Sequence, residues 1–522
     1  MFSELLKKKN IVYLSITFLF FFGTHLLMLL INGEWWDDYV AWNVPLENLY
    51  KEYGPENCND IFNLYYLSFI YQHIAPQYHI LVFRLTSFIV LWIFVVCSWI
   101  VVNHLTNNKH FSFLVCLLIA TFGFDRTAFL TVCIHYAVAN TLFLLGLILF
   151  IKDYQKEKFS FLIGASVIWF TSLIVWRSAA LLIPASVIIA SGLKTNFNYR
   201  VVSSYVNIVK YTIKRYWTII LSCILFVFIY KIFLDQSGIH ASYYKPSIVN
   251  ALMAPILALV SCFTTIISYP ALCLKSLTLE YSLPIALISI ALVAAVCFNI
   301  KRIPHLPILD TLRKKLIMHS FFFLLLSFIL PLSIYGIFTL ATPIEYRSRT
   351  LCLAALPLAV VYVSLLNYLP RKFFCILYAL LLSGSILYTV SGYIDYGFSL
   401  SKTEAIVHFL KEHKELENEK ILFIDNSIDA NGQGFNLRNY EYEGMARIAY
   451  GINTNTLAMS YYGGNRQKFD PSYKVFISQS RYPVQFSDKA KYVAYKHIFH
   501  NEAKAEKVLG NLYQIELKLH NI

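Results

Sequence analysis

The acidic pair Asp37–Asp38 is the strongest candidate for chemistry in this sequence. It lies in the stretch Glu34-Trp35-Trp36-Asp37-Asp38-Tyr39, directly after an apolar run at 11–31 that is long enough to span a bilayer. Two carboxylates beside a membrane are costly unless something pairs or uses them, and a positioned carboxylate can take a proton from a hydroxyl nucleophile. A plainer interpretation, solvated loop charges within an interfacial aromatic belt, stays open.

Three further sets of polar residues fall near the same outer surface in the topology derived below. They are Asp125–Arg126, followed by His135 and Tyr136; Arg177, at a break in an apolar run; and Glu345-Tyr346-Arg347-Ser348-Arg349 before a late span. Arg347 and Arg349 are two donors at a membrane edge, which suits a phosphate or diphosphate head group. Pairing with Glu345 or with ordinary lipid phosphates is the alternative.

The composition indicates what kind of protein must position these groups. Of the 522 residues, 57% are hydrophobic and only 14% are charged, and the mean hydropathy is +0.56. Such a chain has too little polar surface to cover a soluble globule, so we expect an all-α polytopic membrane protein. The ten cysteines mostly lie in apolar runs and show no disulfide framework or metal-ligand spacing.

The net charge of +14 reflects topology rather than nucleic-acid binding. After residue 400 there are 16 Lys/Arg against 14 Asp/Glu, so +12 of the charge lies in the membrane part. There it clusters in short loops, as cytoplasmic loops of membrane proteins do. The N-terminus is expected in the cytoplasm, because Lys7, Lys8 and Lys9 precede the first span. The protein is expected in the inner or plasma membrane of the cell, and we expect no nucleic-acid partner.

This charge pattern predicts about eleven crossings plus one re-entrant or interfacial segment at 250–280. A long first outer loop at 32–77 would carry the acidic pair. The run 159–192 is too long for one helix and is predicted to break at Trp176–Arg177. The expected spans are 11–31, 78–103, 111–124, 127–151, two short helices within 159–192, 217–234, 282–299, 316–340, 350–368 and 372–392.

The character of the chain changes after residue 399, so we divide it into a membrane domain at 1–399 and a second domain at 400–522. Ser401–Lys420 is predicted to be a charged helix, and 421–425, 474–478, 491–495 and 512–517 are predicted strands. Because Arg371 and Lys372 anchor the preceding loop inside, this small α/β domain is expected outside the cytoplasm.

These features resemble the GT-C superfamily of integral membrane glycosyltransferases, which use polyprenyl-phosphate sugars. Trp36-Asp37-Asp38-Tyr39 is similar to the segment after the first span in bacterial members that glucosylate O-antigen and other surface polymers. Cys133-Ile134-His135-Tyr136-Ala137 resembles the helix after the second outer loop of that superfamily. Tyr346-Arg347-Ser348-Arg349 resembles its contact with the lipid phosphate, although it lacks the usual Arg-Tyr order.

The resemblance implies an inverting transfer from a polyprenyl-phosphate sugar to a glycan or glycolipid acceptor in the cell envelope. Asp37 or Asp38 would act as the base or orient the acceptor, and Arg347 or Arg349 would neutralise the leaving phosphate. Further substrate contacts are expected from Glu34, Asp125, Arg126, His135, Tyr346 and Arg177. Whether Asp125 and the second aspartate bind a divalent metal stays open; no metal site is otherwise predicted.

Two other functions compete with transfer. A polymerase or ligase of lipid-linked polysaccharide also has many spans, but typically relies on Arg/His-rich outer loops. A transporter or flippase predicts internal repeats and ionisable residues at the middle of the membrane. The sequence shows no repeat, and its strongest polar groups fall at one face.

Overall fold

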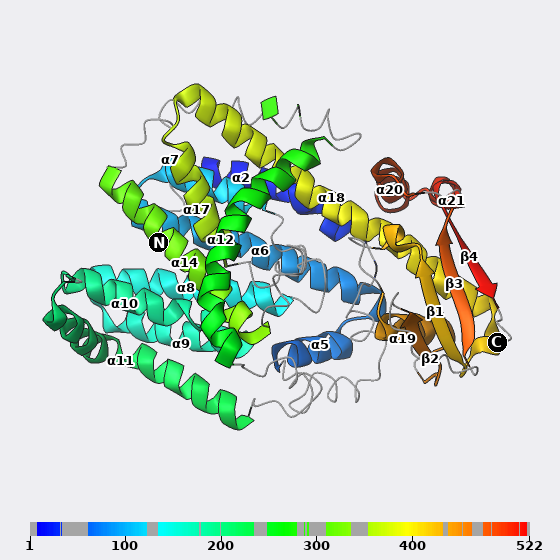
Figure 1. Ribbon diagram of the computed structural model, residues 1–522, viewed down its shortest axis with the longest axis horizontal. Helices are drawn as coiled ribbons and strands as arrows, with labels where there is room; N and C mark the ends of the chain where they lie inside the picture. Colours follow the sequence, from blue (N-terminus) through cyan, green and yellow to red (C-terminus); the bar gives the residue numbers. More distant parts are fainter. Residues whose placement is uncertain are drawn as a thin grey trace.

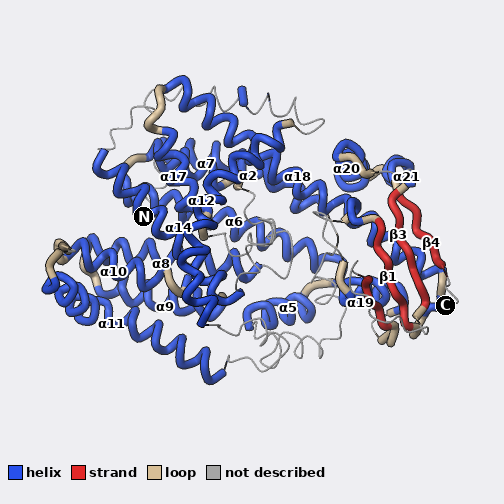
Figure 2. Tube along the Cα trace, in the orientation of Figure 1, coloured by secondary structure: helices blue, strands red, loops and turns tan. Residues whose placement is uncertain are grey.

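The computed structural model is a bundle of helices with a small sheet at one end (Figure 1). The strands gather at that end, and helices make up most of the rest of the described chain (Figure 2). The structure describes residues 8–31, 33, 61–122, 134–176, 179–198, 200–233, 248–278, 287, 290–291, 310–335, 353–431, 437–451, 453–461, 473–481, 483–510 and 512–518.

Twelve long elements build the bundle within these residues. They are α2 (Lys8–Leu30), α5 (Ile61–His73), α6 (His79–Thr106), α7 (Lys109–Ile119), α8 (Ile134–Lys156), α9 (Phe159–Val175), α10 (Leu182–Lys194), α11 (Val202–Phe233), α12 (Ile248–Leu277), α14 (Asp310–Tyr335), α17 (Ala355–Leu366) and α18 (Arg371–Glu412). A short turn, η1 (Pro76–Tyr78), leads into α6.

Six of these helices are long and apolar enough to cross a membrane: α2, α6, α8, α11, α12 and α18. The chain is therefore a helical membrane protein, as its composition predicts. The expected eleven crossings are not supported, because α7, α9, α10 and α17 have only 11 to 17 residues. A helix of that length falls short of the roughly 20 residues that cover the hydrocarbon core.

Two segments of the predicted topology differ in the structure. α12 is continuous for 30 residues through Pro255 and Pro270, and its Tyr269 and Cys273 are buried in the bundle. The prediction of a re-entrant or interfacial segment at 250–280 is therefore wrong, because neighbouring helices hold the proline-containing helix together. The predicted break in 159–192 is confirmed, with α9 ending at Val175 and α10 beginning at Leu182. Most of 282–299 and 336–352 lies outside the described residues.

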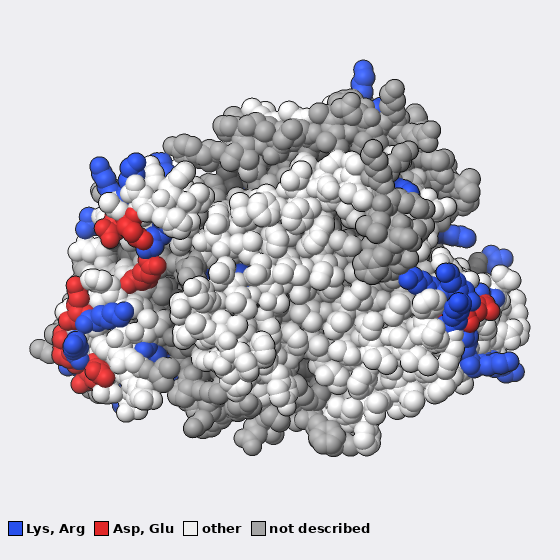
Figure 3. All heavy atoms as spheres, turned by 180° about the vertical axis from the view of Figure 1, so that it is seen from behind, with Lys and Arg blue, Asp and Glu red and all other residues white. Residues whose placement is uncertain are grey.

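Charged side chains gather at the two ends of the molecule and leave a broad uncharged band between them (Figure 3). One end carries the sheet, and the other carries the basic residues of α10 and α11, among them Lys194, Lys210 and Lys214. The band is lined by exposed apolar side chains such as Val167, Leu221 and Ile224. A surface of this kind is adapted to lipid rather than to water.

The helix α18 joins the bundle to the sheet without interruption. Its 42 residues extend about 63 Å at 1.5 Å each, twice the thickness of the hydrocarbon core. The expected boundary at 399/400 falls inside this helix, and so does the start of the helix predicted at 401–420. The last turns of α18 belong to the hydrophobic core of the sheet domain, where Ile406 and Leu410 are fully buried.

The sheet has four strands in the order β2-β1-β3-β4. Strands β1 (Lys420–Asn426), β2 (Leu457–Tyr461) and β3 (Lys474–Ser480) are parallel, and β4 (Tyr513–Lys518) is antiparallel to β3. The predicted strands at 421–425, 474–478 and 512–517 are thus confirmed. β2 was not anticipated by the sequence analysis.

Helices cover one face of the sheet and one of its ends. α18 and α19 (Asn439–Tyr450) pack on the face that carries Phe423 and Phe476, where Phe423 stacks on Tyr442 with ring centroids 4.0 Å apart. The predicted strand at 491–495 is wrong. The chain there forms α20 (Phe486–Val493) and the turn η9 (Ala494–Ile498), followed by α21 (Glu502–Gly510). Two further short turns are η6 (Lys414–Leu416) and η7 (Ile428–Ala430).

Candidate functional site

His135 is the one predicted site residue that the described part of the chain contains. It is the second residue of α8 and is only 5% exposed. The other predicted site residues lie outside the described residues: Glu34, Asp37, Asp38, Asp125, Arg126, Arg177, Tyr346, Arg347 and Arg349. The structure does, however, describe residues adjacent to several of the stretches that carry them.

His135 contacts residues that precede or follow the stretches containing the predicted site residues. Asn63 of α5, which is 1% exposed, donates a hydrogen bond from Nδ2 to His135 Nδ1 at 2.9 Å. The His135 ring also packs against Trp176, with centroids 4.7 Å apart, and Tyr136 lies 4.8 Å from the same indole. Asn63 lies within the first outer loop, 25 residues after Asp38, His135 follows the Asp125–Arg126 stretch and Trp176 directly precedes Arg177. Three polar stretches of the sequence therefore join the bundle at one aromatic cluster.

The beginning of the first outer loop is fixed at a second junction. Arg84 of α6, only 2% exposed, donates from Nη2 to the carbonyl oxygen of Gly33 at 2.6 Å. A Cβ on Gly33 would lie 2.4 Å from the end of the Leu400 side chain, so a larger residue here would require Leu400 to move. The stretch that contains the acidic pair starts at the next residue, Glu34.

Segments from the sheet domain complete this junction. A Cβ on Gly397 would lie 2.9 Å from Ile31 Cδ1 and 3.0 Å from Val493 Cγ2, so α2, α18 and α20 meet closely here. His497 follows α20 by four residues and is buried, only 6% exposed. The pKa of His497 is lowered to about 4, mainly because burial disfavours the charged ring and to a smaller extent because of the positive charges of Lys496 and Arg84.

Helix lengths place this junction at one edge of the apolar band. About 33 Å of helix separates Ile31 from Lys9, and about 33 Å separates Arg84 from the end of α6 at Thr106. Gly397 lies about 39 Å along α18 from Arg371. The hydrocarbon core is about 30 Å thick, so each of these three lengths is enough to cross it. His135, about 32 Å from Lys156, lies at the corresponding level of α8.

Hydrogen bonds inside the bundle fix the start of the stretch that carries Asp125 and Arg126. Ser385 and Thr389 of α18 donate to the Thr121 carbonyl at 2.8 and 2.9 Å. The ring of His25 contacts the Ala120 carbonyl through Nε2 at 3.2 Å and the Tyr393 hydroxyl through Nδ1 at 2.6 Å. A carbonyl only accepts, so Nε2 carries the proton and Tyr393 donates to Nδ1.

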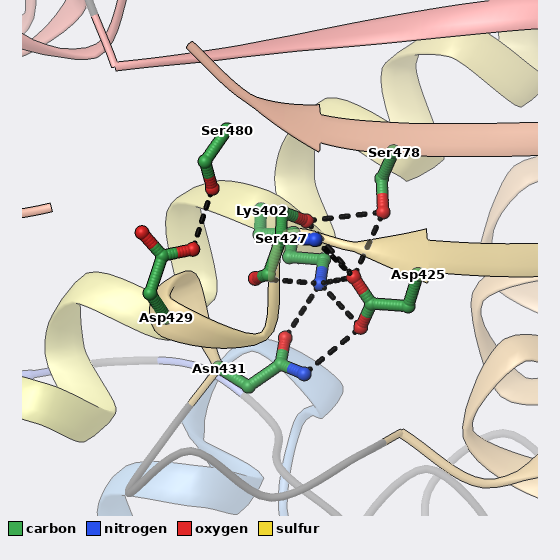
Figure 4. A network of polar contacts seen from close by, with 7 residues as sticks. All are labelled: Lys402, Asp425, Ser427, Asp429, Asn431, Ser478 and Ser480. Carbon is green, nitrogen blue, oxygen red and sulfur yellow. Dashed lines mark hydrogen bonds and ion pairs between the residues drawn. The ribbon is translucent and has the colours of Figure 1, made fainter. Parts of the chain in front are cut away.

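The sheet domain contains a polar network at the carboxyl ends of its parallel strands (Figure 4). Lys402 of α18, only 1% exposed, donates to both oxygens of Asp425 at 2.6 and 2.7 Å and to Asn431 Oδ1 at 2.6 Å. Asp425 also accepts from the hydroxyls of Ser427 and Ser478, each at 2.9 Å. Nearby, Asp429 accepts from Ser480 and from the backbone of Val484.

This network is closed and ionised. Burial alone would raise the pKa of Asp425, but the charge of Lys402 and the hydrogen bonds from Lys402, Asn431 and Ser427 outweigh burial and lower the pKa to about 2. The Lys402 ammonium meets four acceptors, so it retains no proton to donate elsewhere. We therefore assign these residues to fixing the sheet on α18 rather than to chemistry.

The structure tests metal binding only for the residues that it describes. Among them, no group of three His, Cys, Asp or Glu side chains is placed to hold an ion. The aspartates for which a divalent metal stayed open, Asp37, Asp38 and Asp125, lie outside the described residues.

Three residues that organise these contacts were not predicted to do so from the sequence: Arg84, Asn63 and Lys402. Arg84 had a detectable signal, since an arginine within the apolar run 78–103 needs a buried partner. Asn63 and Lys402 had none, because their partners His135 and Asp425 are defined only by the fold.

Comparison with known proteins adds no relative. No family model matches the chain, and neither a curated protein nor a solved structure matches it.

Proposed function

We propose that this protein is a membrane glycosyltransferase that moves a sugar from a polyprenyl-phosphate donor to a glycan or glycolipid acceptor. One observation carries the proposal. Residues before or after the stretches that hold the predicted carboxylates and Arg177 meet at two junctions, Gly33 with Arg84 and His135 with Asn63 and Trp176. We propose that both junctions lie at one edge of the apolar band. A transferase with a lipid-linked donor needs its polar groups at this level, because the donor phosphate lies at the membrane surface.

The junctions suit the acidic pair to the role of base. Asp37 and Asp38 follow Gly33 by four and five residues, and Gly33 is held by Arg84 and packed on Leu400. A fixed starting point for the loop favours a fixed carboxylate, and a carboxylate that takes the acceptor proton contributes about 10²–10⁴-fold to the rate. The second carboxylate would orient the acceptor.

The aromatic cluster suits a sugar-binding wall. Tyr136 and His135 pack against the indole of Trp176 and fix its position. The indole is still partly exposed, so a ligand could contact it. Apolar and aromatic walls with few polar groups are typical of sites for small organic ligands. His135 is too buried to touch a sugar, and we propose it as a positioning residue for Trp176 and Asn63.

The distribution of charge favours one orientation in the membrane. The basic residues of α10 and α11 lie at the end opposite the sheet (Figure 3). Cytoplasmic loops carry the excess of Lys and Arg, so we propose that the junctions and the sheet domain face away from the cytoplasm. Transfer would then build a glycan of the cell envelope.

The donor-phosphate prediction tests this function. Full-length protein in nanodiscs is incubated with a panel of polyprenyl-phosphate sugars and acceptor glycans, and release of polyprenyl phosphate is measured. If Arg347 or Arg349 binds the phosphate, each alanine variant should lose roughly ten- to a hundredfold in donor affinity, because a charge-assisted bond contributes about 1.5–3 kcal/mol. The exposed Arg481, in the sheet domain, gives the matched control Arg481→Ala. No turnover of any donor by the parent would reject the proposal.

A further inference from the structure

The sheet domain exposes two consecutive apolar side chains, Ile498 and Phe499. They are 44% and 68% exposed. In the described part of 413–518, the other exposed large apolar residues, Ile428 and Leu457, stand singly. Single exposed apolar residues are ordinary on a water-facing surface, whereas an adjacent pair that includes a largely exposed phenylalanine calls for an explanation.

The backbone presents this pair rigidly. The Phe499 amide donates to the Ala494 carbonyl at 2.9 Å, and the Asn501 amide donates to the Tyr495 carbonyl at 2.8 Å. His500 then takes a left-handed conformation with φ of 49°, which reverses the chain into α21. The two side chains therefore project from a hydrogen-bonded turn rather than from a loose loop.

The turn lies at the level of the membrane surface. Val493, the last residue of α20, packs closely on Gly397 of α18, and His497, next to Ile498 in sequence, is buried. Gly397 lies about 39 Å along α18 from Arg371, which is more than the roughly 30 Å thickness of the hydrocarbon core, so we take this junction to lie at the membrane surface. Phe499 follows His497 by two residues, so its ring lies at headgroup depth or within a few ångströms of it.

We propose that Ile498 and Phe499 insert into the headgroup region of the bilayer and give the sheet domain a lipid contact of its own. Apolar and aromatic side chains at this depth are the usual anchors of interfacial segments. The exposed Lys504, whose ammonium lies 5.5 Å from the Tyr495 ring centroid, adds a cation suited to lipid phosphate. A protein partner is disfavoured, because two side chains are far from the roughly 800 Å² that each partner buries in a standard interface.

Such a contact would complement the attachment through α18. One helix fixes the domain at a point, and the Lys402–Asp425 network fixes the sheet on that helix. A second contact on lipid would prevent the domain from tilting about α18. The inference does not depend on the proposed reaction, since it concerns only where the domain lies.

Site-directed spin labelling tests the insertion in the full-length protein. Phe499→Cys and, as a matched exposed apolar control on the sheet, Leu457→Cys are labelled in nanodiscs of phosphatidylcholine and phosphatidylglycerol. The signal of the labelled parent, which has its own cysteines, is subtracted. We expect collisions with oxygen, relative to a water-soluble nickel chelate, to be several-fold more frequent at 499 than at 457. Both positions are surface sites, so the substitutions should leave folding intact.

Two outcomes would overturn the proposal. A label at 499 that is as accessible to nickel as the label at 457 would show that the turn faces water. A label that is immobilised and shielded from both oxygen and nickel would show that a protein, such as a second copy of this chain, covers the turn.

Discussion

Replacing Lys402 by methionine should loosen the sheet from the helix that carries it. Lys402 is 1% exposed and Asp425 is 8% exposed, so the substitution leaves a carboxylate buried without its counter-charge. Breaking a buried pair from one side typically costs about 3–5 kcal/mol. Asp425 would still accept hydrogen bonds from Asn431, Ser427 and Ser478. We therefore expect the loss of stability to lie near the lower end of this range, at about 3 kcal/mol. Methionine keeps most of the lysine volume, so the effect should be electrostatic.

Hydrogen exchange of peptides from β1 measures this loss in the intact protein. Because about 1.4 kcal/mol corresponds to a factor of ten, opening of the strand should become roughly a hundredfold more frequent in Lys402→Met. The exposed Lys411→Met on the same helix is the control and should exchange like the parent. Adding Asp425→Asn to Lys402→Met removes the buried charge and should restore part of the protection. Exchange in Lys402→Met within about threefold of the parent would refute the role assigned to the network.

Two further substitutions test the packing of the bundle and its junction with the sheet domain. The pKa of His497 is about 4 in the fold against 6.5 in the unfolded chain, so the unfolded state binds the proton first. The contribution of neutral His497 to the free energy of unfolding is therefore complete above pH 6.5 and falls by up to about 3 kcal/mol as the pH drops towards 4. His497→Gln should remove that part of the pH dependence of thermal unfolding. A Cβ on Gly384 would lie 2.6 Å from the Cys273 carbonyl, so Gly384→Ala should destabilise the contact of α12 with α18 by about 1–3 kcal/mol. Gly23→Ala, with nothing within 4 Å, should not lower the unfolding temperature.

The class of the protein and three of its four strands could be predicted because each rests on a local pattern. An apolar run such as 78–103 must lie in lipid, and a short buried run such as 421–425 fits a strand. The prediction failed where distant contacts outweigh local signals. Gly397 and the rise in charge after residue 400 indicate a break, yet α18 continues because Gly397 packs on Ile31 and Lys402 binds Asp425.

The predicted strand at 491–495 failed for a related reason. Tyr492 and Val493 have β-forming side chains, but these neighbours are buried together against α18, which a helix permits and an alternating strand does not. The sequence predicts the site only as a set of polar stretches, and nearly all of their residues lie outside the described ones. Their joining depends on the pairs Arg84–Gly33 and Asn63–His135, which are 51 and 72 residues apart and carry no mutual signal in one sequence.

Glycosyl transfer by Asp37→Asn and Asp38→Asn, compared side by side with the parent, tests the proposed function most directly. Asparagine keeps the size of the side chain but removes its basicity, so the variant that lacks the base should lose about 10²–10⁴-fold in transfer. We expect the larger loss at Asp37, and we expect both variants to accumulate in the membrane like the parent. Asp488→Asn, on the surface of the sheet domain, is the control for loss of a carboxylate. Full transfer by both variants would contradict the assignment of this protein as an enzyme that uses the acidic pair.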